Sequence, residues 1–247
     1  NSNLGSVLGV AALALIPFVL KLTAGAAGAD GDVAAAGGLS EGFLSAFLLI
    51  FFSEIGDKTF FIAVLLALKQ PKSAVFAGTF GALAVMSFIS VALGEVLHKL
   101  DELIPLNTDL PLDDYAAVAL LVYFGVSTIK DAAVPKQEEE KAEAEEEVEG
   151  MNLDSQTTMS LIVSTFLLVF AAEWGDKSFL ATIALAAASS PVGVVSGAIA
   201  GHGVATGIAV VGGSLLGDYV SEKTAGYVGG SLFLIFAITT LASTFTQ

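Results

Sequence analysis

The chain has 247 residues, of which 55% are hydrophobic and 14% are charged, and its mean hydropathy is +0.80. A soluble domain carries about a quarter charged residues, so this composition is typical of a protein dissolved in lipid and argues against a soluble enzyme. All ten basic residues are Lys and the formal net charge is −15, which excludes nucleic-acid binding because nothing could neutralise a phosphate backbone. The absence of Cys excludes disulfides, thiolate metal sites and cysteine nucleophiles.

The N-terminal apolar stretch, residues 4–20, has two interpretations. It is followed by Lys21 and a run of small residues, so it is either an extra transmembrane helix or a targeting region with a cleavage site. We favour the extra helix. Because the chain begins with Asn1 rather than Met, we also expect an upstream transit segment to have been removed or omitted.

Six later stretches are apolar and long enough to predict membrane helices, since a bilayer core about 30 Å thick needs roughly 20 apolar residues in a helix. The third is short for a full crossing, so it either extends towards Leu112 or crosses where the membrane is thin. The predicted segments are residues 43–68, 74–93, 115–129, 159–188, 192–216 and 225–241.

Between the third and fourth segments, residues 136–150 hold eight Glu and two Lys. A segment of this composition cannot bury enough apolar surface to fold alone, so we expect a solvated linker. Its function is either that of a charged hinge between two halves, which we favour, or that of an acidic lure that concentrates cations near a channel mouth.

The two halves of the chain repeat each other at an offset of 119 residues. This offset aligns residues 45–51 with 164–170 at five of seven positions, and the motif EIGDKT at 54–59 with EWGDKS at 173–178. Each half has three predicted crossings, an odd number, so the second copy enters the membrane from the opposite side, as in many secondary transporters. The sequence therefore predicts an all-α multi-pass membrane protein with two three-helix inverted repeats and an extra N-terminal helix. The predicted divisions are residues 1–41 for the N-terminal segment, 42–132 for repeat 1, 133–156 for the acidic linker and 157–247 for repeat 2.

Lysines near the segment ends predict the orientation. Six of them follow the first, third or fifth segment, and only Lys21 and Lys99 lie on the opposite face. The positive-inside rule places the side with more lysines, together with the acidic linker, in the cytosol or stroma. The six are Lys69, Lys72, Lys130, Lys136, Lys141 and Lys223.

The two copies of the charged motif fall near the middle of long apolar segments. A carboxylate there costs about 2.5–3.5 kcal/mol on insertion scales, so four of them indicate a function. If each segment is one continuous helix, positions i and i+3 share a face, which stacks Glu54 on Asp57 and Glu173 on Asp176. At an inverted-repeat interface the four would form one carboxylate cage. The hydroxyls of Thr59 and Ser178 would lie beside it.

Four carboxylates in a low-dielectric site cannot all remain ionised unless a divalent cation or protons compensate their charge. The cage therefore predicts an exchanger, in which metal binds as protons leave and protons return when the metal has gone. Oxygen donors favour Ca²⁺, Mn²⁺ or Mg²⁺ over Zn²⁺ or Cu⁺, and the spacing does not choose among the first three. No organic cofactor is expected.

Other residues of the motif leave alternatives open. Lys58 and Lys177 are either counter-ions that pair with a carboxylate of the other repeat in the empty state, or static, snorkelling lysines. Gly56 and Gly175 mark either broken helices, whose freed carbonyls also bind the ion, or close helix packing. Trp174 is interpreted as a space-filler beside the site.

The fifth segment contains two further features. Gly193, Gly197 and Gly201 at four-residue spacing predict a close helix contact. His202 is the only histidine inside a predicted segment, and its counterpart in the first repeat is Leu83. It is either a proton relay or, as we favour, a hydrogen-bonded packing residue.

With both copies intact, the sequence resembles the membrane cation exchangers defined by two Glu-x-Gly-Asp-Lys/Arg-Ser/Thr motifs, the GDT-type Ca²⁺/Mn²⁺:H⁺ exchangers of the Golgi, bacteria and chloroplasts. The resemblance covers about residues 42–241. It implies that the cation binds the motif carboxylates Glu54, Asp57, Glu173 and Asp176. The second half looks most like the chloroplast and cyanobacterial branch, whose members move Mn²⁺.

That branch implies a location in the thylakoid or inner envelope membrane of chloroplasts, with a Golgi or bacterial membrane as the alternative. It also implies delivery of manganese for the oxygen-evolving complex. The implied partners are divalent cations, protons and the lipid bilayer, and a homo-oligomer is a further possibility.

Two hypotheses from other classes compete with transport. An intramembrane aspartyl protease also places an Asp in each of two membrane segments, but it does not need a Glu three residues before each one. A non-transporting assembly factor for photosynthetic complexes would keep its effect after all four carboxylates were neutralised.

Overall fold

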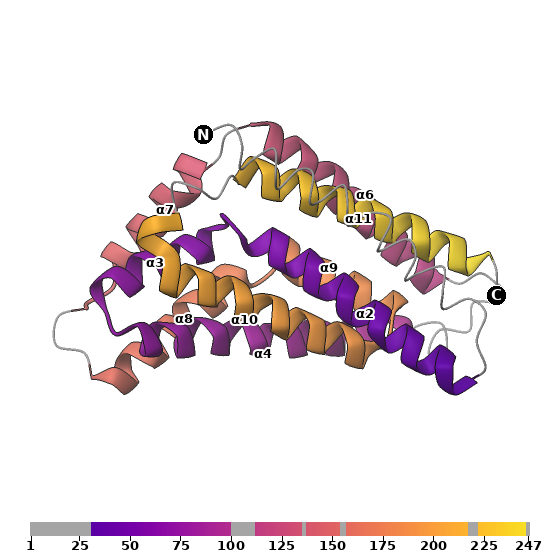
Figure 1. Cartoon of the computed structure of the whole chain (residues 1–247), viewed down its shortest axis with the longest axis horizontal. Coiled ribbons are helices and arrows are strands. Elements are labelled where there is room, and N and C mark those ends of the chain that lie inside the picture. The colour runs from indigo at the N-terminus through magenta and orange to yellow at the C-terminus, as the bar shows by residue number, and fades with distance from the viewer. Residues whose placement is uncertain (1–30, 100–111, 135–136, 154–156, 217–221, 246–247) are drawn as a thin grey trace.

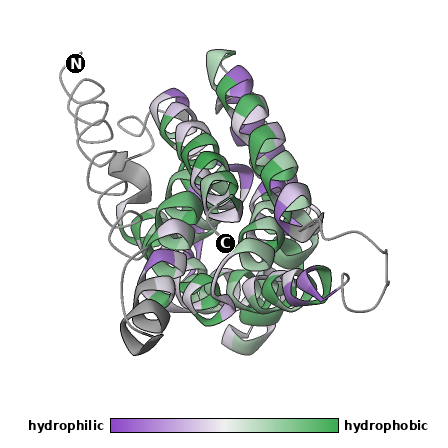
Figure 2. Cartoon of the chain, turned by 90° about the vertical axis from the view of Figure 1, so that its right-hand side faces the viewer, coloured by the Kyte–Doolittle hydropathy of each residue, from purple (hydrophilic) through white to green (hydrophobic). Residues whose placement is uncertain are grey.

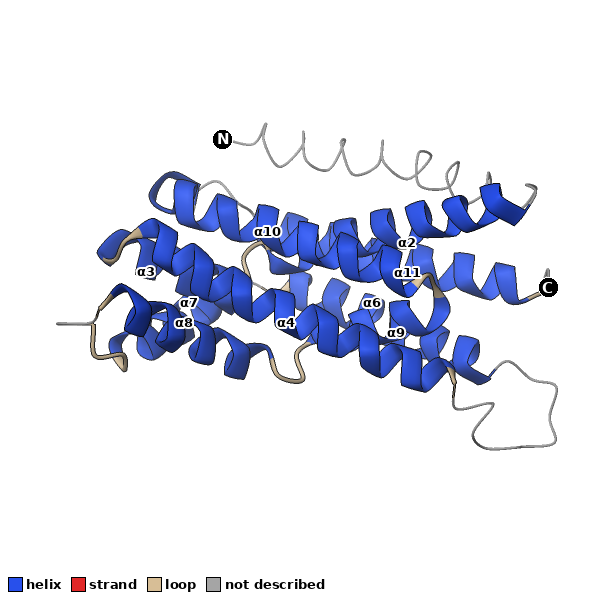
Figure 3. Cartoon of the chain, turned by 90° about the horizontal axis from the view of Figure 1, so that it is seen from below, coloured by secondary structure: helices blue, strands red, loops and turns tan. Residues whose placement is uncertain are grey.

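The computed structural model describes residues 31–99, 112–134, 137–153, 157–216 and 222–245 (Figure 1). The predicted N-terminal helix at residues 4–20 lies outside these ranges. Within them every regular element is a helix, as Figure 3 shows, which confirms the predicted all-α class. The helices are α2 (Gly31–Glu54), α3 (Lys58–Lys69), α4 (Lys72–His98), α6 (Leu112–Ala133), α7 (Gln137–Glu149), α8 (Thr158–Glu173), α9 (Lys177–Ala188), α10 (Pro191–Leu216) and α11 (Glu222–Thr244).

Several of these helices are suited to a membrane. Among the described residues, α4, α6, α10 and α11 each contain a stretch long and apolar enough to span a bilayer, and the bent pair α8–α9 would make a fifth span. Figure 2 shows hydrophobic residues along the outward faces of the helices. Large apolar side chains such as Phe88, Leu167 and Ile238 are exposed there, as expected for surfaces that face lipid. The sequence prediction of a membrane protein is therefore confirmed.

Each segment that carries a charged motif is broken in two. The chain leaves the helix after Glu54 and after Glu173, and the next helix begins four residues later, at Lys58 and Lys177. The breaks occur where Gly56 and Gly175 adopt positive φ angles of 87° and 84°. This backbone region is open to glycine and costly for other residues. At the second break, α8 and α9 differ in direction by 71°. Of the two alternatives for these glycines, the broken helix is therefore correct.

The break corrects one prediction. We expected Glu54 and Asp57, and likewise Glu173 and Asp176, to stack on the face of one continuous helix. Instead each Glu is the last residue of one helix, and each Asp is the N-cap of the next. The i, i+3 rule does not apply because the positive φ of the intervening glycine ends the helical path.

Glycines bring the long helices into close contact. A Cβ atom on Gly197 of α10 would lie 2.1 Å from the carbonyl oxygen of Phe43 on α2. A Cβ on Gly78 of α4 would lie 2.7 Å from the Cβ of Thr165 on α8. Gly78 and Gly197 are counterparts at the offset of 119, so α4 packs on α8 as α10 packs on α2. The predicted close contact along α10 is confirmed.

The pair formed by α6 and α11 lies along one side of the molecule (Figure 1). It packs against α2 through α11 and against α9 through α6. In the described part of the chain its contacts with α3 and α8 are at most marginal. The pair is therefore seated on one end of the two broken segments and not on the other.

Most side chains of the acidic linker are exposed, in agreement with a solvated linker, but the segment also forms a helix that the sequence analysis did not predict. α7 lies against α3, with Ala144 and Val148 fully buried in the core cluster that α3 shares with α4, α8 and α10. These residues are four apart and so share one face of the helix. Two apolar contacts on one face are enough to dock a helix whose other side chains are mostly exposed Glu.

Candidate functional site

Both charged motifs fold into the same turn. At each break the Asp N–H donates to the Glu carbonyl three residues earlier, over 3.3 Å in the first copy and 3.1 Å in the second. Asp57 and Asp176 then cap α3 and α9. The Asp176 carboxylate also accepts a hydrogen bond of 3.2 Å from the Ser178 N–H. The turn thus places two carboxylates per motif beside the middle of a bent segment.

Glu54 and Glu173 are buried, with 4% and 2% of their surfaces exposed. Each accepts a hydrogen bond from the hydroxyl five residues later. Thr59 donates to Glu54 over 3.4 Å, and Ser178 donates to Glu173 over 3.2 Å. The predicted hydroxyls are therefore beside the acids, where each satisfies one carboxylate oxygen.

The four motif acids lie in one region of the protein. Glu54 is within electrostatic range of Glu173, Asp57 and Asp176, and Asp57 is within range of Asp176 and Glu173. The Thr59 hydroxyl of the first copy also lies close to Glu173 of the second. However, no three acidic or histidine side chains of the described residues are close enough together to hold a metal ion in this conformation. The structure gathers the predicted acids without closing a ligand shell.

A cavity of about 90 Å³ borders the two Asp residues of the motif. It lies between the α6–α11 pair, the two breaks and the linker helix α7. Its lining includes Asp57, Asp176 and Lys177, together with Asp131 from the end of α6 and Glu140 from α7. Glu140 also acts electrostatically on Asp57. This volume could hold several waters or a hydrated cation, and its charged lining is mostly acidic.

Neither motif lysine is paired with a motif acid in the described structure. The Lys58 ammonium lies 2.9 Å from Glu147 and 3.8 Å from Glu143, both on α7. The Lys177 ammonium pairs with Asp131 of α6. Lys177 thus does pair with a carboxylate of the other predicted repeat, whereas Lys58 pairs with the linker.

Sequence reasoning missed the acids that surround the motif. Asp131 lies at the end of an apolar segment and was not singled out, and Glu140, Glu143 and Glu147 were treated as part of a solvated run. The available signal was the spacing of Ala144 and Val148 within that run, because two apolar residues four apart predict one buried helix face.

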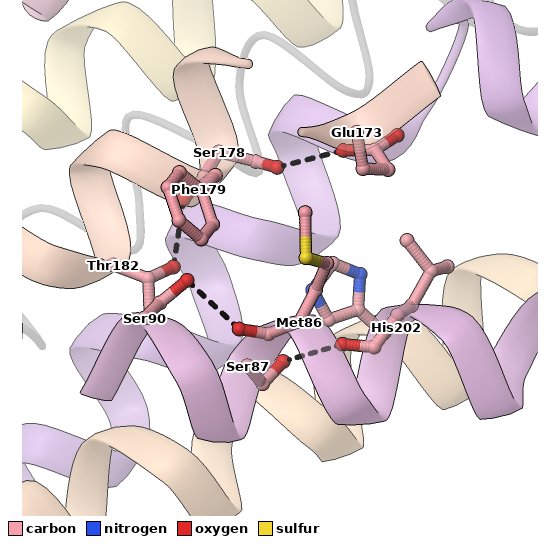
Figure 4. A pocket seen from close by; sticks show the side chains of 9 residues that line it. Met86, Ser87, Ser90, Glu173, Ser178, Phe179, Thr182 and His202 are labelled. Carbon is pink, nitrogen blue, oxygen red and sulfur yellow. Dashed lines mark hydrogen bonds between the residues drawn. The ribbon is translucent and has the colours of Figure 1, made fainter. Parts of the chain in front are cut away.

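On the side of the breaks facing α4 and α10 lie two smaller pockets, each of about 10 Å³, which is room for about one water. They are counterparts at the offset of 119. One is bordered by Glu173, Ser178 and Phe179, and the other by Glu54, Thr59 and Phe60. Figure 4 shows the first pocket, which Ser87, Ser90 and Thr182 also line, each with its hydroxyl donating to a backbone carbonyl of its own helix. Among the described residues, the acids therefore border a wider cavity on one side and two small pockets on the other.

His202 of α10 also borders the first pocket, and only 4% of its surface is exposed. Its Nδ1 atom lies 3.6 Å from a Glu54 oxygen and has no hydrogen-bond partner among the described residues. Trp174, in contrast, is 59% exposed and packs between Phe170 and Phe179 beside the second break. It lies beside the site, as expected, but an indole this exposed does not fill interior space, so the predicted space-filling role is wrong.

The chain matches the family model described as "Divalent cation/proton antiporter GDT1" over residues 42–136 and 161–247. These ranges contain both motifs, the helices α3, α4, α6, α9, α10 and α11 in full, and the parts of α2 and α8 that lead into the motifs, whereas α7 lies outside them. No solved structure matches the chain.

Three curated relatives illustrate the similarity. The chain is 59% identical over 218 residues to the chloroplastic protein PAM71 of Arabidopsis thaliana, covering 85% of this chain and 59% of that protein. It is 58% identical over 214 residues to the chloroplastic GDT1-like protein 1 of Oryza sativa subsp. indica, covering 83% and 63%. It is 40% identical over 204 residues to the GDT1-like protein sll0615 of Synechocystis, covering 79% and 94%.

The chain spans about three fifths of the length of the two chloroplastic relatives. The family model nevertheless covers both breaks, their acids and the helices α4, α6, α10 and α11. From this match, and from the duplicated motif at the centre of the fold, the chain belongs to the GDT1 family of divalent cation/proton antiporters.

Proposed function

We propose that this protein is a secondary-active antiporter that exchanges Mn²⁺, and also Ca²⁺, for protons. The observation that carries the proposal is the meeting of four motif acids at two glycine breaks of the same geometry. The cation would bind Glu54, Asp57, Glu173 and Asp176, with Thr59 and Ser178 as supporting groups.

The helix ends favour a bound cation. Glu54 and Glu173 end α2 and α8, where the aligned peptide dipoles place partial negative charge. An anion at a helix C-terminus is destabilised, and the last carbonyls there lack intrahelical donors. A divalent cation at the breaks would compensate the carboxylates and these carbonyls together. The two motif lysines, Lys58 and Lys177, pair with other acids, Glu147 and Asp131.

Protons and metal would compete for the same oxygens. Metal binding requires ionised carboxylates, whereas an empty buried site is more stable when protons neutralise some of them. Loading the metal therefore releases protons, and protonation releases the metal. This coupling needs no residue beyond the four acids.

The seating of the α6–α11 pair supports a two-state transport cycle. Under the inverted-repeat proposal, α2 and α8 are counterparts, and so are α9 and α3. The pair now packs on α2 and α9 and leaves the cavity open towards the linker. Moving it onto α8 and α3 would generate the pseudo-symmetric state, closed towards the linker and open on the other side. Because lysines mark the linker side as cytosolic or stromal, the present state would face the stroma.

The chloroplastic relatives support a plastid membrane, and we propose the thylakoid or inner envelope. In a thylakoid the lumen is acidic, so protons flowing to the stroma would drive metal into the lumen. Manganese delivered in this way would serve the oxygen-evolving complex.

The test is metal uptake by proteoliposomes containing the whole chain, with an imposed pH gradient. Uptake of Mn²⁺ should depend on the gradient and should be lost in Asp57→Asn and in Glu173→Gln. Glu95→Gln is the matched control, because Glu95 pairs with Lys99 near the end of α4, away from the breaks. If Asp57→Asn and Glu173→Gln transport as fast as this control, the carboxylate site is wrong. If all four carboxylates can be neutralised without loss of biological effect, the protein is an assembly factor.

A further inference from the structure

His202 lies beside the motif acids, and the four-carboxylate site leaves its role unexplained. It lies on α10, buried, and its ring borders the same pocket as Glu173 and Ser178 (Figure 4). Its Nδ1 atom faces a Glu54 oxygen at 3.6 Å and has no hydrogen-bond partner in the described structure. A buried ring nitrogen without a partner is costly, so it calls for an explanation.

The distance between the Nδ1 atom of His202 and the Oε1 atom of Glu54 is informative. At 3.6 Å it is too long for a hydrogen bond. Two neighbouring ligands that bind a first-row metal ion at about 2.0–2.2 Å, at right angles to each other, are separated by roughly 2.8–3.1 Å. The imidazole nitrogen and the Glu54 oxygen, 3.6 Å apart, therefore need to approach each other only slightly to bind a single ion.

The position is also asymmetric. The counterpart of His202 at the offset of 119 is Leu83, and both residues border the pocket in Figure 4. The pseudo-symmetric site can thus receive one nitrogen donor, from the second half only. The fold already accommodates a leucine at the equivalent position, Leu83, so a leucine at position 202 would reproduce an existing arrangement.

We propose that His202 is a nitrogen ligand of the transported cation, joining Glu54, and that it determines specificity for Mn²⁺ over Ca²⁺. This inference rests on the proposed transport function. Ca²⁺ and Mg²⁺ take oxygen ligands almost exclusively, whereas imidazole binds first-row transition metals. An all-oxygen cage discriminates weakly between Mn²⁺ and Ca²⁺, and one imidazole shifts the balance towards Mn²⁺. The open ligand shell of this conformation would close when the ion draws Glu54 and His202 onto itself.

The direct test is electron spin-echo spectroscopy of Mn²⁺ bound to the purified whole chain, with and without ¹⁵N-labelled histidine. The chain has two histidines, His98 and His202, so His98→Leu is a matched control. We expect a directly bound nitrogen in the unaltered protein and in His98→Leu, changed by the label, and no such signal in His202→Leu. The unaltered protein answers the question even if His202→Leu fails to fold.

Transport gives a second readout. In proteoliposomes His202→Leu should lower Mn²⁺ uptake more than Ca²⁺ uptake, and so reduce the Mn²⁺:Ca²⁺ preference by roughly tenfold, within the range for lost support of a metal site. A merely structural histidine would lower uptake of both ions together.

The outcomes separate the two proposals. Bound Mn²⁺ without histidine nitrogen coupling, or an unchanged Mn²⁺:Ca²⁺ preference in His202→Leu, overturns the assignment of His202 and leaves antiport standing. A protein that binds neither ion, with or without the substitution, overturns the proposed function as well.

Discussion

The ammonium of Lys58 lies 2.9 Å from the carboxylate of Glu147, which ties the first residue of α3 to the linker helix α7. Lys58 directly follows Asp57, the N-cap that borders the cavity. α7 also places Glu140 in the wall of that cavity. The linker is thus attached to α3. In the proposed cycle the α6–α11 pair would have to approach α3 when the linker side closes, so α7 lies next to this movement.

The first prediction concerns this attachment. Replacing Glu143 and Glu147 together by Gln should loosen α7, because both carboxylates that contact Lys58 lose their charge. A partly exposed pair of this kind contributes about 1 kcal/mol or less, so amide exchange in α7 should accelerate by up to about fivefold. Hydrogen exchange read by mass spectrometry measures the change.

The control is Glu145→Gln with Glu146→Gln, which alters the net charge equally at two exposed positions. Equal exchange rates in the two double variants would mean that burial of Ala144 and Val148 alone holds the helix.

The sequence predicted the elements of the site better than their geometry. Hydropathy, the offset of 119 and the twin motif predicted most of the membrane helices, the paired acids and their hydroxyl partners, although residues 43–68 are not among the candidate spans of the described chain. The helical i, i+3 argument for Glu54 and Asp57 was wrong because one glycine torsion outweighed the apolar pattern on either side of it. Such a torsion leaves no periodic signal, and only the presence of Gly within the motif suggested it.

The second prediction tests that torsion. Gly175 has a φ of 84° and open space where a Cβ would lie. Gly175→Ala should therefore cost about 1–2 kcal/mol through backbone strain alone, and Gly175→Asn should cost less because Asn tolerates this region. Thermal unfolding in detergent micelles gives the comparison. Gly38→Ala, within α2 and equally uncrowded, serves as the control and should be neutral or stabilising. If Gly175→Ala matches Gly38→Ala in stability, the turn does not depend on the positive φ.

The third prediction concerns close packing of α10 on α2. Gly197→Ala places a methyl group 2.1 Å from the Phe43 carbonyl oxygen, a backbone atom that cannot rotate away. The helices must separate, at a cost of about 1–3 kcal/mol or more. Gly207→Ala on the same helix is the matched control, since the nearest atom would lie 4.0 Å away. Chemical unfolding should show a lower free energy of unfolding for Gly197→Ala only. If both variants lose the same stability, the contact with Phe43 is not the cause of the loss.

The sequence also did not predict the partners of the two motif lysines or the contact of His202 with Glu54, because these contacts join residues far apart in the chain. Asp131 and Lys177 are 46 positions apart, and Lys58 and Glu147 are 89 apart, so their pairing depends on how the α6–α11 pair and α7 are seated. His202 could be recognised as unusual because its counterpart is Leu83. Its contact with Glu54 required the packing of α10 on α2.

The fourth prediction is the pH dependence of metal binding. Because protons and Mn²⁺ compete for the motif carboxylates, affinity should rise with pH by up to about tenfold per pH unit for each proton released. Titration of the purified protein with Mn²⁺, followed by the electron paramagnetic resonance of the free ion, measures this slope. Glu54→Gln should flatten it by removing one competing group. A slope near zero in the unaltered protein would argue against exchange on these acids.

The fifth prediction concerns access to the site. The chain has no Cys, so single cysteines report on their own positions. Thr128 lines the cavity beside Asp131, whereas Ser87 lines the small pocket on the other side of the acids. In vesicles of known orientation, a membrane-impermeant maleimide added on the linker side should label Thr128→Cys and leave Ser87→Cys unlabelled. An imposed pH gradient that drives the α6–α11 pair onto α3 and α8 should then slow labelling of Thr128→Cys, because the cavity closes. Labelling of Ser87→Cys from the linker side, or of Thr128→Cys at one rate under all gradients, would show that the pair does not gate the acids.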